Sequence, residues 1–215
     1  MSELADVTES LFRSLGEIRA IGILRGCPPE HVVAVTRAAV EAGFKVVEVT
    51  LDSPGALQSI ELLTDSFPDL TIGVGTVRTG EEVAWAIQAG ASFVVSPVVE
   101  EQVIGACGKH KIPVLPGAAT PTEVFRALCL GAEAVKLFPA VQLGGPAYVA
   151  AIRGPLGNPR LVPTGGISAE NGRAFLDAGA VAVGVGGSVF TRDALARGDA
   201  GQVGSQATAF VRSIT

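Results

Sequence analysis

A lysine inside an apolar segment is the first residue of this sequence that suggests chemistry. Lys136 lies in EAVKLFPAV, residues 133–141, where most of the neighbouring side chains are aliphatic. Burial disfavours the charged ammonium form of a lysine, and a neutral amine is a nucleophile that gives a Schiff base with ketones. A carboxyl group beside the amine can move the protons that imine formation requires. The segment therefore predicts carbonyl chemistry, provided that a carboxyl group lies within reach.

Glu48 is the second charged residue within an apolar segment, KVVEVTL at 45–51. Side chains alternate along a strand, so Glu48 would share a face with Val46, and Lys136 would share one with Ala134. A buried salt bridge without a catalytic role is the alternative interpretation of such a pair. Because buried ion pairs stabilise a fold poorly, we favour a catalytic pair.

Two glycine-rich segments, PTGGIS and VGVGGSV, follow the last two apolar runs of the chain. Gly165, Gly166, Gly187 and Ser188 can each present a backbone N–H to an anion, and Ser168 is expected to cap the helix that follows. Glycines also serve ordinary tight turns, so either segment alone indicates little. The two together, at the ends of neighbouring strands, favour a phosphate site.

These residues belong to a regular alternation of strand-like and helix-like segments. Short runs rich in Val and Ile predict strands, and the stretches between them have helical periodicity. The predicted strands are 20–26, 45–51, 71–77, 92–97, 112–118, 134–140, 160–166 and 181–187. We expect a TIM (β/α)8 barrel, as one domain over residues 1–215, with an extra N-terminal helix at about 4–19. An open doubly wound sheet is disfavoured, because ILRGCPP has one glycine where a dinucleotide-binding turn has three.

Glycines and prolines mark the expected ends of the helices. Glycine after a helix accepts the left-handed conformation that stops it, and Ser, Thr or Pro is favoured at the start. The expected stops are Gly43, Gly90, Gly131 and Gly179. The expected starts are Pro28-Pro29, Ser53-Pro54, Thr79, Thr120-Pro121 and Ser168.

Active sites of such barrels lie at the carboxyl ends of the strands. The first, third, fourth and seventh predicted strands end near Arg25, Thr76, Pro97 and Thr164, respectively. We therefore expect these residues on the same end of the barrel as Lys136.

Composition excludes several other classes of function. The net charge of −5, without a cluster of Lys and Arg, argues against nucleic-acid binding. The chain lacks an uncharged helical run of roughly 18 residues, so we expect no membrane span. Three widely spaced cysteines and an acidic first segment predict a reduced, cytoplasmic protein without a signal peptide. No His, Cys, Asp or Glu cluster has the spacing of a metal site.

Seven motifs taken in order resemble the class I KDPG/KHG aldolases. They are EVTL (48–51), GVGTV (73–77), VSP (95–97), PG (116–117), VKLFPA (135–140), PTGGIS (163–168) and VGVGGS (183–188). The resemblance implies a lyase that cleaves 2-keto-3-deoxy-6-phosphogluconate (KDPG) to pyruvate and glyceraldehyde 3-phosphate. Some members act instead on 4-hydroxy-2-oxoglutarate. It also implies a homotrimer that needs no metal or other cofactor, because the intermediate is a covalent imine.

The resemblance assigns a role to each matching position. Lys136 would form the Schiff base, and Glu48 would act as general acid and base with a water. Thr76 and Pro97 would line the pocket of the pyruvate imine, and Phe138 would pack beside the lysine. The phosphate would be held by Thr164, Gly165, Gly166, Gly187 and Ser188.

One position departs from the family pattern and concerns the substrate. Many members have arginine where this chain has Asp52, and that arginine is expected to hold the substrate carboxylate. Asp52 would repel it, so we expect Arg25, in the Leu-Arg pair of the first strand, to take over. The Ser-Pro after Asp52 resembles the branch that acts on the galactonate epimer, so the epimer stays open. A non-catalytic sugar-phosphate-binding barrel and another phosphate-binding barrel enzyme, an epimerase or a synthase, are the remaining alternatives.

Overall fold

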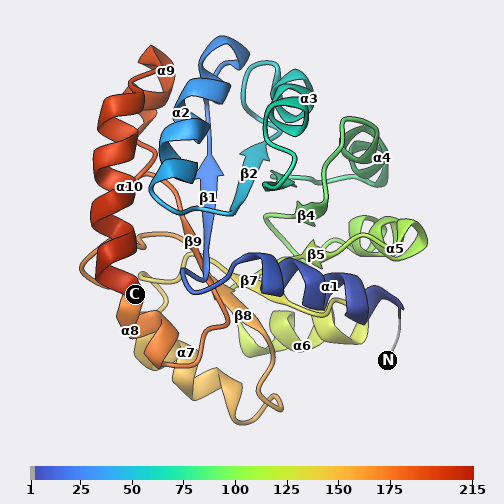
Figure 1. Ribbon diagram of the computed structural model, residues 1–215. Coiled ribbons are helices and arrows are strands. Elements are labelled where there is room, and N and C mark those ends of the chain that lie inside the picture. The colour runs from blue at the N-terminus through green and yellow to red at the C-terminus, as the bar shows by residue number, and fades with distance from the viewer. Residues whose placement is uncertain (1–2) are drawn as a thin grey trace.

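The computed structural model describes residues 3–215 and contains nine short strands and ten helices in this range (Figure 1). The strands are β1 Ala20–Leu24, β2 Val46–Thr50, β3 Thr71–Gly75, β4 Phe93–Val95, β5 Val114–Leu115, β6 Gly117–Ala118, β7 Val135–Leu137, β8 Leu161–Pro163 and β9 Val183–Val185. The helices are α1 Glu3–Ser14, α2 Pro29–Glu41, α3 Ala56–Ser66, α4 Gly80–Gln88, α5 Glu101–His110, α6 Pro121–Cys129, α7 Gly145–Arg153, α8 Gly172–Asp177, α9 Arg192–Arg197 and α10 Ala200–Ile214. None of these helices has the length and apolar character needed to span a bilayer.

All paired strands are parallel and form one curled sheet in two parts. The order is β5-β4-β3-β2-β1-β9 in one part and β6-β7-β8 in the other. β5 and β6 are the halves of the predicted fifth strand, separated at Pro116, which has no N–H to give to a strand ladder. The Pro116 carbonyl still accepts the N–H of Lys136 at 2.9 Å, and a bridge between Thr164 and Gly184 connects β8 with β9. Each predicted strand is therefore present, with shorter bounds.

The inner face of the sheet is closed at the amino-terminal ends of the strands by α1. Leu11 of α1 and Leu15, which directly follows α1, pack in one buried cluster with side chains from the inner face. Those side chains are Ile21, Val46, Phe93, Val95, Leu115, Ala134, Val162 and Ala182. Val46 and Ala134 are the residues expected to share a face with Glu48 and Lys136, so the predicted alternation is correct. Among the described residues, no comparable apolar cluster fills the opposite, carboxyl end of the sheet.

Most predicted helix ends are confirmed, and two starts are wrong. Gly43, Gly90, Gly131 and Gly179 all have positive φ just after a helix. Thr79 and Thr120 form complete capping boxes at α4 and α6. α3, however, begins after Gly55 rather than at Ser53-Pro54, because a turn over 51–55 comes first. Ser168 does not cap α8, which begins at Gly172 after a further turn.

Candidate active site

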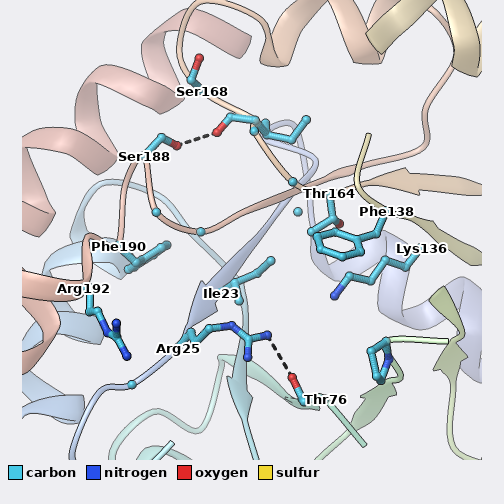
Figure 2. A pocket seen from close by; sticks show the side chains of 18 of the residues that line it. Ile23, Arg25, Thr76, Lys136, Phe138, Thr164, Ser168, Ser188, Phe190 and Arg192 are labelled. Carbon is cyan, nitrogen blue, oxygen red and sulfur yellow. Dashed lines mark hydrogen bonds between the residues drawn. The ribbon is translucent and has the colours of Figure 1, made fainter. Parts of the chain in front are cut away.

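A cavity of about 910 Å³ opens at the carboxyl ends of the strands (Figure 2). Its walls come from β1, β7 and β9 and from the segments that follow β1, β2, β3, β4, β7, β8 and β9. Ten residues singled out in the sequence line it: Arg25, Thr76, Pro97, Lys136, Phe138, Thr164, Gly165, Gly166, Gly187 and Ser188. The fold therefore brings together side chains that are more than 160 positions apart in the chain, as Arg25 and Ser188 are.

Lys136 occupies the middle of β7 and points into the cavity (Figure 2). Its residue is only 8% exposed, and its Nζ lies 5.6 Å from the centre of the Phe138 ring. Within residues 3–215 this amine has neither a hydrogen bond nor an ion pair. The amine is thus sheltered, faces the cavity and is not engaged by a carboxylate.

Glu48 lies beneath the cavity in the centre of β2 and is 2% exposed. Its Oε1 is buried without a hydrogen-bond partner in the described part of the chain. Glu48, Lys136 and Thr164 line a second, small cavity of about 10 Å³, close to the space that one water needs. Because Glu48 and Lys136 share this space without forming an ion pair, the alternative of a plain buried salt bridge does not hold.

Burial governs the protonation of Glu48. Desolvation raises its pKa above the ordinary value of 4.5, and the opposing charges of Lys136 and Arg25 lower it to a smaller extent. A carboxyl group that is neutral over a wider pH range can donate a proton as well as accept one.

The raised pKa predicts how Glu48 affects stability as pH changes. The group favours folding fully below the unfolded pKa of about 4.5, and this contribution is lost as pH rises through the higher folded pKa. Glutamine cannot ionise. The melting temperature of Glu48→Gln relative to wild type should therefore increase between about pH 4 and about pH 8. Thermal unfolding of both proteins over this pH range measures the difference between their melting temperatures. A difference that does not change with pH would contradict the raised pKa of Glu48.

Two glycines make room for the polar side chains of this region. A Cβ at Gly75 would lie 2.6 Å from Oε1 of Glu48, and a Cβ at Gly184 would lie closer still to Oγ1 of Thr164. Both approaches are shorter than van der Waals contact. The small residues on neighbouring strands therefore allow Glu48 and Thr164 to point inward, which the sequence motifs did not reveal.

Arg25 is held by two neighbours at the mouth of the cavity. It forms an ion pair with Asp52, and its Nη2 donates a hydrogen bond to Oγ1 of Thr76 at 3.0 Å (Figure 2). Burial raises the pKa of Asp52, but hydrogen bonding from Thr50 and the charge of Arg25 outweigh it, and the net pKa lies below 3.8. Asp52 is therefore ionised at neutral pH. The sequence indicated only that Asp52 would repel the carboxylate of a ligand. It did not indicate that Asp52 pairs with Arg25.

The backbone at Thr76 is unusual for a β-branched residue. Its φ of 64° is in the left-handed region, which a threonine adopts only at an energetic cost. Such strain concentrates at binding and catalytic sites. Here it accompanies the hydrogen bond that fixes the Arg25 guanidinium.

The two glycine-rich loops are tied to each other by side chains. Ser188 Oγ donates to the carbonyl of Ile167 at 2.7 Å, across the two loops (Figure 2). Asn171 accepts from the N–H of Ser168 and donates to the carbonyl of Gly166, both at 2.9 Å. Outside the helix and strand ladders, the described residues provide no acceptor for the N–H groups of Gly166 and Ser188. These fixed donors suit an anion.

Several cavity residues were missed by the sequence analysis. They are Ile23, Gly26, Ile167, Gly184, Gly186, Phe190 and Arg192, together with Ser168, which was expected only as a helix cap. Arg192 matters most, because it is a cation. Its position four residues after Ser188, in the segment that follows the last strand, was a signal that could have identified it.

A polar cavity at the carboxyl ends of parallel strands, above a sheltered lysine and a carboxyl group, is typical of the active sites of α/β-barrel enzymes. Residues 13–206 match the family described as KDPG and KHG aldolase, so this chain belongs to that family.

Related proteins match most of the chain. The 2-dehydro-3-deoxy-phosphogluconate aldolase of Treponema pallidum (strain Nichols) is 36% identical over 194 residues, 90% of this chain and 92% of that protein. The 2-dehydro-3-deoxy-6-phosphogalactonate aldolase of Escherichia coli (strain K12) is 36% identical over 195 residues, 90% and 93% of the two chains. A KDPG aldolase structure from Legionella pneumophila, with pyruvate captured at low pH as a covalent carbinolamine intermediate, has a TM-score of 0.83 and 29% identity, covering 97% and 98%.

Proposed function

We propose that this chain is a class I aldolase that cleaves a 2-keto-3-deoxy sugar acid 6-phosphate through a Schiff base on Lys136. The substrate is KDPG or its galactonate epimer, and the products are pyruvate and glyceraldehyde 3-phosphate. One observation carries the proposal: Lys136 and Glu48 face the same small cavity, both buried, without an ion pair between them. The covalent pyruvate adduct in the related Legionella structure supports an amine nucleophile.

The first half of the reaction forms the iminium. The Nζ of Lys136 adds to the C2 ketone, and the resulting carbinolamine loses its hydroxyl group as water. Glu48, whose pKa is raised by burial, supplies the proton for this loss through a water in the small cavity. The carboxylate that remains is the base for the next step.

The second half breaks the carbon skeleton. Glu48 accepts the proton of the C4 hydroxyl group through the same water, while the electron pair of the C3–C4 bond moves into the iminium. Glyceraldehyde 3-phosphate leaves, and the enamine takes up a proton at C3. Water then adds to the imine, which frees pyruvate and restores the amine.

The substrate ends are assigned by charge. The carboxylate lies toward Arg25 and Thr76, and the phosphate lies toward Thr164, Gly165, Gly166, Gly187 and Ser188. Activity on 4-hydroxy-2-oxoglutarate, giving pyruvate and glyoxylate, is a second reaction that the same pyruvate half-site allows. The family name of the matching residues favours it.

We also propose the finer architecture. The hydrogen bond from Lys136 to the Pro116 carbonyl and the bridge between Thr164 and Gly184 join the two parts of the sheet, which supports closure into a (β/α)8 barrel. In this proposal α1 lies at the amino-terminal end of the barrel, and the chain is a single domain. A homotrimer, a cytoplasmic location and independence from metals and other cofactors stay predictions. Exposed Trp85 on α4 and Phe125 on α6 would suit subunit contact. Light scattering of the purified protein measures the trimer.

Trapping with borohydride tests the proposed function. Incubation with pyruvate and sodium borohydride should add one reduced pyruvate group, and peptide mapping should place it on Lys136 among the four lysines of the chain. A non-catalytic sugar-phosphate-binding barrel, an epimerase or a synthase would yield no adduct. An intact mass without the addition, from protein that is folded by circular dichroism, would overturn the proposal.

Asp52 should weaken the binding of the pyruvate carboxylate. Asp52→Asn keeps an oxygen acceptor for Arg25 but removes the negative charge beside it. We expect the KM for pyruvate in aldol addition to fall by about threefold, a modest effect because both side chains are half exposed. Asp193→Asn, an exposed carboxylate on α9 that does not line the cavity, is the matched control. A higher KM in Asp52→Asn would instead mean that the charge is needed to position Arg25.

A further inference from the structure

We propose that Arg192 is a specificity-determining residue that binds the phosphate group of the substrate. This inference rests on the proposed aldolase function and deepens it. Arg192 begins α9 and lines the cavity beside Phe190, across from Lys136 (Figure 2). It lies outside the glycine-rich motifs.

The charge of Arg192 is uncompensated. Among residues 3–215 it has no hydrogen bond or ion pair, whereas Arg25, the other arginine of the cavity, is paired with Asp52. Neighbouring Asp193 is exposed and does not line the cavity. Arg192 is therefore free to bind an anion that enters.

The negative charge of the substrate exceeds the positive charge that the other lining residues provide. A phosphate monoester carries roughly −1.5 to −2 at neutral pH, and the substrate adds a carboxylate. The pair of Arg25 and Asp52 contributes no net charge, because the two opposite charges lie together. Arg192 is then the one arginine among the described lining residues whose charge is not balanced by a carboxylate.

Position favours the phosphate over the carboxylate. The carboxylate is bonded to C2, the atom that Lys136 attacks, and Arg25 with Thr76 lies on that part of the wall. Arg192 belongs to the segment that continues from Gly187 and Ser188, whose N–H groups are proposed phosphate donors. Backbone N–H groups orient an anion but carry no net charge, and the forked guanidinium of arginine supplies both charge and paired donors.

Aldol addition with two acceptors tests this assignment. Pyruvate is the donor, and kcat/KM is measured for glyceraldehyde 3-phosphate and for glyceraldehyde with wild type and Arg192→Gln. We expect the phosphorylated-to-unphosphorylated ratio of kcat/KM to fall by about tenfold in the variant, the size of one charged hydrogen-bonding contact. The fall should shrink at high salt, because the side chain is exposed. Arg197→Gln, on the same helix but outside the cavity, should keep the wild-type ratio.

The possible outcomes separate this inference from the proposed function. An unchanged acceptor ratio in Arg192→Gln, with the borohydride adduct still formed on Lys136, would overturn the inference and leave the aldolase proposal intact. An increased KM for pyruvate with the same acceptor ratio would assign Arg192 to the carboxylate and would also overturn it. If the wild-type protein did not form the reduced pyruvate adduct, the proposed aldolase function itself would be overturned.

Discussion

Lys136→Met should lower kcat for aldol cleavage by about 10⁵-fold and abolish trapping by borohydride, as expected when a nucleophile is removed from a covalent mechanism. Methionine is similar in length but has no amine, so the C2 ketone would remain unmodified. Coupled detection of pyruvate release measures the rate. A variant that retains activity within tenfold of wild type would show that another group initiates the reaction.

Stability separates this catalytic role from a structural one. Lys136 is buried without an ion pair, so replacing it by an apolar side chain should leave the melting temperature equal or higher. Lys109→Met, on the exposed end of α5, is the control for loss of a lysine charge and should keep full activity. A large loss of stability in Lys136→Met would indicate that the amine supports the fold instead.

Glu48→Gln should lower kcat by about 10²- to 10⁴-fold, the range typical of lost general acid–base catalysis. The amide has nearly the same shape and fits the space beside Gly75, but it cannot give and take a proton. Because Lys136 remains, pyruvate should still be trapped on it by borohydride, although more slowly. The two variants are therefore distinguished by adduct formation, and not by rate alone.

Glu61→Gln, at an exposed position of α3, is the control for this change. It should have the wild-type rate. If Glu48→Gln also had the wild-type rate while remaining folded, protons would have to move through a different group. Thr164, the remaining polar side chain of the small cavity, would then be the next residue to replace.

Local patterns were sufficient to predict most of the fold. Apolar runs with Val and Ile identified each strand, and Gly43, Gly90, Gly131 and Gly179 identified the ends of four helices. These signals depend on neighbours within a few residues, such as capping and the left-handed conformation of glycine. The errors at Ser53 and Ser168 arose where a turn precedes the helix, since a good capping residue does not by itself place the first turn.

Some site residues could likewise be predicted from local sequence, and others could not. Lys136 and Glu48 stood out because a charge inside a strand is costly wherever the strand is buried. Arg192 and the pairing of Arg25 with Asp52 did not stand out, because a charged residue outside an apolar run is ordinary in sequence. Its role depends on the groups that the fold places near it.

The sequence by itself determined the alternating elements, the family resemblance and the identity of the two buried charged residues. Only the tertiary structure decided that Glu48 and Lys136 meet across a small cavity without pairing, that Asp52 neutralises Arg25, and that Arg192 faces the same cavity unpaired. The reason is physical: secondary structure follows from interactions between near neighbours in the chain, whereas charge pairing and desolvation depend on distances between strands that only the curled sheet sets.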